Sequence, residues 1–162
     1  VLSEFGMQYE EILKHAYTFK GLPHRMEYVG YFKGIHFYND SIATIPEASL
    51  LAIQSLEKVN ALIIGGYDRG IDYADYLANL AGSEIEHIIL VGELQAEFHQ
   101  ILKATYKGTL HQVGNMQEVV ETCYKVCQKD NVCLLSPAAS SYDQYRNFED
   151  RGDQFKKLIE TT

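Results

Sequence analysis

The chain has 162 residues and carries 14 Lys and Arg against 22 Asp and Glu, a formal net charge of −8. Its length suits one domain, and its 46% apolar content is enough for a buried core. The acidic balance argues against nonspecific binding to nucleic acid or anionic lipid, because both need a cationic patch. No apolar run approaches the ~20 residues of a membrane-spanning helix, and the first residues lack a signal-peptide pattern, so we expect a cytoplasmic protein.

A lead-in helix and a β-hairpin are predicted in the N-terminal part of the chain. Residues 7–17 place apolar side chains at helical spacing, and Gly21 and Pro23 stop that helix. We therefore expect 1–20 to be a lead-in helix and linker, and the valine at the start fits a fragment of a longer chain. Two segments rich in β-branched and aromatic residues flank Lys33-Gly34, which predicts the hairpin.

Helices and strands alternate after the hairpin. The pattern predicts helices over 46–56, 73–81, 94–104, 115–128 and 150–160, and strands over 61–66, 87–93, 109–114 and 131–137. Asp72 and the Asn115/Glu118 pair have the spacing of helix N-terminal caps. Short continuous apolar strands separated by helices are typical of a Rossmann-like α/β domain, with a mainly parallel sheet covered by helices on both faces.

The three cysteines, Cys123, Cys127 and Cys133, are odd in number and lie late in the chain. That distribution fits reduced thiols better than a disulfide framework. Cys123 and Cys127 share a face of a predicted helix, but no further cysteine or histidine lies at ligand spacing. We therefore expect buried structural thiols and no metal site.

The candidate binding loops follow the predicted strands. In an open parallel sheet, ligands bind beyond the carboxyl ends of the strands, which here means residues 39–41, 65–70, 91–93 and 136–141. Simpler interpretations stay open: Asp40 and Ser41 suit a helix cap, and Gly65-Gly66 suits a tight strand exit. No G-x-x-x-x-G-K-[ST] phosphate loop and no G-x-G-x-x-G sequence is present, so nucleotide chemistry would need a partner domain.

These loops, in order, resemble the C-terminal domain of the Mur ligases, and most closely that of the members that add D-glutamate. The matching segments are 19–25, 39–44, 65–70, 135–144 and 147–152. The most specific are LPHR and the SPA segment paired with NFEDRG. They span nearly the whole chain. The resemblance implies a three-domain enzyme of bacterial cell-wall synthesis, in which 1–20 end the central, ATP-binding domain and 21–162 form the amino-acid-binding domain.

In such ligases ATP, with Mg²⁺, phosphorylates the carboxylate of UDP-N-acetylmuramoyl-L-alanine, and the amine of glutamate attacks the acyl phosphate. The N-terminal and central domains of the same chain hold the UDP-sugar and most of the ATP. The resemblance therefore implies that this domain binds and orients, contributes no catalytic residue, and is inactive alone. It assigns Arg25 and Asp40 to the nucleotide. It assigns Thr44 and Arg69 to the α-carboxylate of glutamate, and Ser141 with the backbone near Tyr142 and Phe148 to the side-chain carboxylate.

Three positions depart from the common family pattern. Ile42 and Arg69 each stand where lysine is usual, and Tyr142 stands where a smaller apolar residue is frequent. A shifted carboxylate clamp leaves L-glutamate open as the alternative substrate to D-glutamate. A non-catalytic α/β module that binds a small acidic ligand is the alternative from another class of protein.

Overall fold

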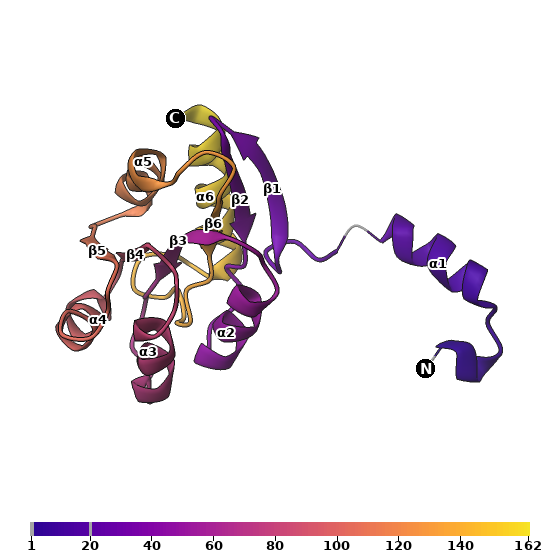
Figure 1. The fold of residues 1–162 in the computed structure, drawn as a ribbon, viewed down its shortest axis with the longest axis horizontal. Coiled ribbons are helices and arrows are strands. Elements are labelled where there is room, and N and C mark those ends of the chain that lie inside the picture. Colours follow the sequence, from indigo (N-terminus) through magenta and orange to yellow (C-terminus); the bar gives the residue numbers. More distant parts are fainter. Residues whose placement is uncertain (1, 20) are drawn as a thin grey trace.

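The computed structural model describes residues 2–19 and 21–162. Its centre is a six-stranded sheet in the order β1-β2-β6-β3-β4-β5 (Figure 1). β1 pairs antiparallel with β2, and all other neighbours pair in parallel. The strands are β1 (Glu27–Phe32), β2 (Ile35–Asn39), β3 (Val59–Ile64), β4 (His87–Leu90), β5 (Thr109–Gln112) and β6 (Val132–Leu135). The predicted α/β fold with its hairpin is confirmed.

Helices cover both faces of the sheet (Figure 1). One face packs against α2 (Pro46–Gln54), α3 (Ala74–Ala81) and α4 (Gln95–Leu102), and the other against α5 (Met116–Val126) and α6 (Phe148–Thr161). Successive residues of β3 divide between the two cores: Leu62 and Ile64 face the first, Ala61 and Ile63 the second. Because both faces of β3 are buried, its sequence is continuously apolar rather than alternating.

The helix ends follow their capping groups. α6 starts two residues before its predicted first residue because the Asn147 side chain accepts a hydrogen bond from the Asp150 N–H. The predicted Asn115/Glu118 cap is present, since the Glu118 N–H donates to Asn115 Oδ1. β3, β4 and β5 end before the glycines of their predicted ranges, which belong to the loops at the carboxyl edge.

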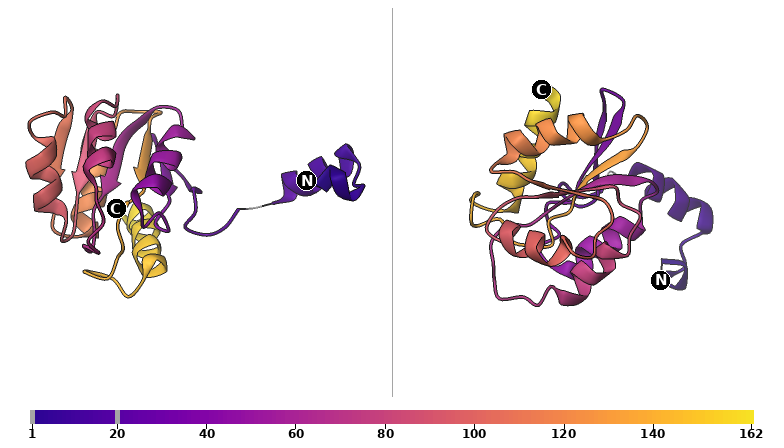
Figure 2. Two further views of the ribbon diagram at one scale, coloured as in Figure 1. Left: turned by 90° about the horizontal axis from the view of Figure 1, so that it is seen from below. Right: turned by 60° about the vertical axis from the view of Figure 1, so that its left-hand side comes forward.

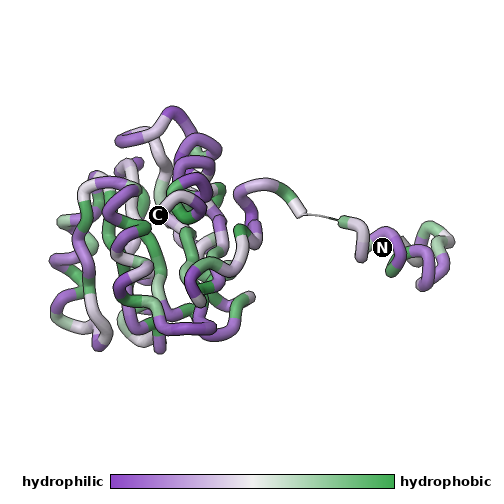
Figure 3. Tube along the Cα trace, turned by 90° about the horizontal axis from the view of Figure 1, so that it is seen from above, coloured by the Kyte–Doolittle hydropathy of each residue, from purple (hydrophilic) through white to green (hydrophobic). Residues whose placement is uncertain are grey.

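The lead-in segment projects from the domain (Figure 1 and Figure 2, left). A short 3₁₀ helix, η1 (Leu2–Phe5), precedes α1 (Tyr9–Thr18), in which no residue is buried. α1 carries both hydrophilic and hydrophobic stretches along its length (Figure 3). The boundary at residue 20 stays a prediction. No helix among the described residues is long and apolar enough to cross a membrane.

Candidate functional site

Five parallel strands end at one edge of the sheet, and their exit loops form the candidate site. Arg25, Asp40 and Thr44 line one pocket of about 640 Å³ beside α2, together with Ile42. Two other loops, 65–73 and 136–147, follow β3 and β6, which are neighbours in the sheet. The three loops contributed by β2, β3 and β6 therefore converge, as their place in the sequence predicts.

Asp40 is a buried carboxylate at the exit of β2. The Met26 N–H donates to its Oδ1 (3.2 Å), and the Ser136 hydroxyl donates to its Oδ2 (2.8 Å). Burial raises the pKa of Asp40, although these two hydrogen bonds and nearby Arg25 oppose that rise. The helix-cap interpretation of Asp40 is wrong, because α2 begins six residues later with Ile45 at its cap.

Arg25 brings an exposed cation to the rim of the same pocket. Its backbone N–H donates to the Leu22 carbonyl, whereas its guanidinium has no hydrogen bond or ion pair within the described residues. Thr44, two residues after Ile42, is half-buried in the same pocket. Its hydroxyl also has no hydrogen-bond partner within the described residues. Both side chains are thus available to a ligand.

Arg151 joins two of the exit loops, and sequence reasoning missed it. It is 2% exposed although it is charged. Its Nε donates to Ser41 Oγ, and its terminal nitrogens donate to the carbonyls of Ser41, Ala139 and Ser140, at 2.8–3.3 Å. Burial lowers the pKa of Arg151 to about 10, so it stays protonated at neutral pH. Its position in the NFEDRG segment was the available signal.

Ser141 and Phe148 lie on the loop and helix that follow β6. Ser141 is buried, and its carbonyl accepts hydrogen bonds from the Gln144 and Tyr145 N–H groups. The Ser41 hydroxyl donates to the Phe148 carbonyl (2.8 Å), which ties the first turn of α6 to the exit of β2. Tyr142 is exposed, with 67% of its surface accessible to solvent.

Arg69 occupies the exposed loop after β3. Its guanidinium makes no hydrogen bond or ion pair within the described residues. The Tyr67 N–H donates to the Ser140 carbonyl (2.9 Å), so the Arg69 loop and the Ser141 loop are joined side by side. The structure brings these two predicted carboxylate ligands onto linked loops, without direct contact between their side chains.

Gly65 and Gly66 are required by close backbone packing. A Cβ on Gly65 would lie 2.2 Å from the Val91 carbonyl oxygen, and one on Gly66 would lie 2.2 Å from that of Ser140. Both glycines have positive φ. The interpretation of this pair as a tight strand exit is therefore correct, and the close packing brings the exits of β3, β4 and β6 together.

A second buried cluster supports the β2 exit from beneath. The Asn39 amide donates to His24 Nδ1 and to Glu27 Oε2, both at 3.0 Å. Gly152 in α6 leaves room for this cluster, since a Cβ there would lie 2.3 Å from His24 Nδ1. The LPHR and NFEDRG segments, far apart in the sequence, therefore meet through His24 and Gly152.

The cysteines form a group away from the loops. The Cys133 and Cys123 sulfurs lie 3.2 Å apart as free thiols, and burial raises the pKa of Cys133. Cys127 is half-buried, so the expectation that all three are buried is wrong for it. The described residues contain no group of three His, Cys, Asp or Glu side chains arranged for a metal ion.

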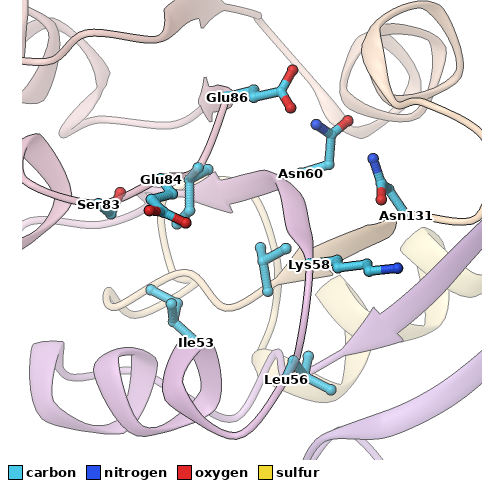
Figure 4. A pocket seen from close by; sticks show the side chains of 10 residues that line it. Ile53, Leu56, Lys58, Asn60, Ser83, Glu84, Glu86 and Asn131 are labelled. Atoms are coloured by element: carbon cyan, nitrogen blue, oxygen red, sulfur yellow. The ribbon is translucent and has the colours of Figure 1, made fainter.

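Another pocket, of about 420 Å³, lies at the amino ends of the strands (Figure 4). Lys58, Asn60, Glu84, Glu86 and Asn131 contribute its polar lining. None of the predicted site residues lines it. It is therefore separate from the exit loops, at the opposite edge of the sheet.

Comparisons with known proteins match most of the chain to one family. Residues 24–139 match the family described as Mur ligase, glutamate ligase domain. The chain is 38% identical over 156 residues to UDP-N-acetylmuramoylalanine–D-glutamate ligase from Caldanaerobacter subterraneus subsp. tengcongensis, covering 95% of this chain and 34% of that protein. It is 39% identical over 155 residues to the protein of the same name from Latilactobacillus sakei subsp. sakei, covering 96% and 34%.

The fold is also similar to that of solved structures. UDP-N-acetylmuramate-alanine ligase MurC from Thermotoga maritima superimposes with a TM-score of 0.66 at 13% identity, covering 98% of this chain and 35% of that one. The chain thus spans about a third of the length of the relatives it matches. The family match covers residues 24–139, more than half of the chain, and the chain therefore belongs to the Mur ligase family.

Proposed function

We propose that the full-length protein is an ATP-dependent ligase that adds D-glutamate to UDP-N-acetylmuramoyl-L-alanine, a cytoplasmic step of peptidoglycan synthesis. The observation that carries the proposal is the 38–39% identity to D-glutamate ligases over nearly the whole chain. The described domain supplies the amino-acid site and closes over the nucleotide. N-terminal and central domains of the same protein supply the rest, including most of the contacts to ATP and Mg²⁺.

Arg25 and Asp40 face the nucleotide in this proposal. Each Asp40 oxygen accepts one intramolecular hydrogen bond and keeps a lone pair for another donor, such as a ribose hydroxyl. The guanidinium of Arg25 is exposed at the rim of the same pocket. The residues present therefore fit a nucleotide that reaches this pocket from a neighbouring domain.

Glutamate needs donors at both of its carboxylates. Arg69 and Thr44 serve the α-carboxylate, and Ser141 with the backbone N–H groups of Tyr142 and Phe148 serves the other. A charge-assisted pair such as Arg69 with a carboxylate is about twice as strong as a neutral hydrogen bond. ATP supplies the phosphoryl group that activates the carboxylate of the UDP-sugar. The amine of glutamate then displaces phosphate, so that an amide forms and ADP and phosphate leave.

Positioning is the contribution of this domain to the rate. Holding the amine against the activated carboxylate turns a bimolecular attack into an oriented one, which is worth roughly 7–11 kcal/mol of barrier in favourable cases. Arg151 and the paired glycines keep the loops that do so at fixed spacing. Preorganised loops of this kind reduce the ordering cost of binding.

The direct test is a ligase assay with the full-length protein. It is incubated with ATP, Mg²⁺ and UDP-N-acetylmuramoyl-L-alanine, plus either D- or L-glutamate, and phosphate release and product mass are measured. We expect product with D-glutamate. Product with L-glutamate alone would assign the variant specificity that Ile42, Arg69 and Tyr142 leave open. Glutamate binding without turnover would favour the non-catalytic module, and turnover by residues 1–162 alone would contradict the division of labour.

Arg69→Ala tests the glutamate site in the same assay. Loss of a charge-assisted contact should raise the KM for glutamate by about 10- to 100-fold, with a far smaller effect on the KM for ATP. Lys125→Ala is the control, because Lys125 is an exposed cation in the last turn of α5, outside the exit loops. Unchanged glutamate kinetics in the Arg69 variant would remove Arg69 from the site.

A further inference from the structure

The loop that carries Arg69 is held by a chain of hydrogen bonds that starts on another element. The Asp68 N–H donates to Glu93 Oε2 (3.2 Å), and the Gly70 N–H donates to Asp68 Oδ1 (2.7 Å). Arg69 therefore lies within a turn that the Asp68 side chain closes, and Glu93 holds the first residue of that turn. Glu93 follows β4, so it reaches the Arg69 loop from the neighbouring strand exit.

Glu93 itself is fixed from the loop that carries Ser141. The Glu93 N–H donates to Asp143 Oδ2 (3.0 Å). Close packing sets this position, since a Cβ on Gly92 would lie 2.3 Å from the same carboxylate oxygen and 2.8 Å from the Gly66 Cα. The Asp143 carboxylate, Gly92 and Gly66 thus leave no space for a shift at this point.

Asp143 lies two residues after Ser141, and Asp68 lies one residue before Arg69. The hydrogen bonds Asp143–Glu93 and Glu93–Asp68 consequently connect the loops of the two proposed carboxylate ligands through a third strand exit. The Tyr67 N–H to Ser140 carbonyl bond joins the same loops nearer the sheet. Two separate links fix two loops in orientation as well as in distance, whereas one link leaves a hinge.

We propose that Glu93 is a positioning residue that sets the separation of Arg69 from Ser141, and hence the KM for the dicarboxylate amino acid. The inference rests on the proposed function, because it takes Arg69 and Ser141 as the ligands of the two carboxylates. Glu93 acts through the Asp68 backbone and does not contact the substrate.

Charge and position predict opposite effects for Glu93. Its carboxylate lies near a site proposed for a substrate with two carboxylates, so its field alone opposes their binding, and removing the charge would lower the KM for glutamate. If Glu93 positions Arg69, removing the acceptor oxygen raises that KM instead. Glutamine separates the two, because it removes the charge and keeps an oxygen that accepts the Asp68 N–H.

The experiment compares Glu93→Ala, Glu93→Gln and Glu97→Ala in the full-length ligase. Glu97 is an exposed glutamate one turn into α4 and makes no hydrogen bond or ion pair within the described residues, so it controls for charge. We expect Glu93→Ala to raise the KM for glutamate roughly threefold to tenfold, as loss of one hydrogen bond predicts. The melting temperature should stay unchanged, because Glu93 is exposed, and the KM for ATP should stay unchanged as well. Glu93→Gln and Glu97→Ala should bind glutamate at least as well as the wild type.

Two results would overturn the proposal. If Glu93→Ala and Glu93→Gln both lower the KM for glutamate, Glu93 acts only through its field; if neither changes it, the Asp68 contact does not position Arg69. Arg69→Ala in the same series keeps this outcome distinct from failure of the proposed function. If the wild type is active, Arg69→Ala raises the KM for glutamate and Glu93→Ala leaves it unchanged, only the positioning role of Glu93 is refuted. If the wild type forms no ligase product, the proposed function itself is refuted.

Discussion

Asp40 is a residue at which stability and proposed function oppose each other. Its carboxylate is 4% exposed and lacks a salt bridge within the described residues, so ionisation costs solvation free energy. The hydrogen bonds from the Met26 N–H and the Ser136 hydroxyl stabilise the ionised form of Asp40, and so does the positive charge of Arg25. Buried and pre-oriented acceptors are common at ligand sites, where they reduce the stability of the empty protein.

Asp40→Asn should raise the melting temperature at pH 7. Because the folded-state pKa of Asp40 is raised, the folded protein holds its proton more tightly than the unfolded chain does. The aspartate therefore costs stability as pH rises through its pKa and costs nothing when it is protonated. The gain in melting temperature from asparagine should therefore shrink as the pH falls into the acidic range. In the full-length ligase the same substitution should raise the KM for ATP, because Asp40 is a proposed nucleotide ligand.

Thermal unfolding of residues 1–162 between pH 4 and pH 8 checks this. Asp75→Asn is the control, because Asp75 is an exposed aspartate in the first turn of α3 and should give no gain at neutral pH. A melting temperature of Asp40→Asn at or below that of the wild type at pH 7 would contradict a net cost of the Asp40 charge.

At the scale of elements, Arg151 connects α6 to the exits of β2 and β6. Its planar fork of five N–H donors matches carbonyl oxygens on two different loops. Arg151→Lys retains the charge but offers one compact group in place of the fork, leaving buried carbonyls of Ala139 and Ser41 without donors. We expect the free energy of unfolding to fall by about 2–3 kcal/mol.

Urea unfolding at constant m-value measures that loss. Arg146→Lys is the same substitution at a site with an 87% exposed side chain, and it should change the free energy by less than about 0.5 kcal/mol. Similar stabilities for the two variants would show that the Arg151 network contributes little. Ser141 and Phe148 lie on the elements that Arg151 joins, so a real loss should also raise the KM for glutamate.

The elements themselves were largely predictable, because each carries its own local signal. The Asn115/Glu118 cap and the apolar run of β3 needed no tertiary information. Their order was not predictable from periodicity: β6 lies between β2 and β3, although it comes last in the sequence. The burial of Arg151 was also hidden, since a charged residue in a helix is normally exposed and its partners are the Ser41 hydroxyl and backbone carbonyls of distant loops.

The site was predictable only as a set of loops. Resemblance assigned Arg25 and Asp40 to the nucleotide and Thr44 to glutamate, whereas the structure places all three in the lining of one pocket. Which carboxylates hold the loops in register could not be read from the sequence, because the contact from Glu93 to Asp68 depends on the pairing of β3 with β4. Long-range hydrogen bonds of this kind need the register as well as the elements.

Charge at the scale of the whole molecule works against the proposed ligands. The net charge is −8, and both ATP and glutamate are anions, so the average field of this domain repels them. Attraction must be local, and Arg25 and Arg69 each present an exposed guanidinium that makes no hydrogen bond or ion pair among the described residues. Exposed cations at the rim of an acidic domain concentrate attraction at the site itself.

The lead-in segment supplies the last prediction, which concerns the boundary near residue 20. No residue of α1 is buried, and Tyr17 is 85% exposed, so this helix adds little to the apolar burial that stabilises the domain. Residues 21–162 should therefore melt within about 2 °C of residues 1–162 by scanning calorimetry, and removal of the exposed aromatics should improve solubility. Leu80→Ala, which truncates a buried core residue, is the positive control for destabilisation. A fall of more than about 5 °C on removing 1–20 would mean that the segment packs on the domain, and that the boundary lies elsewhere.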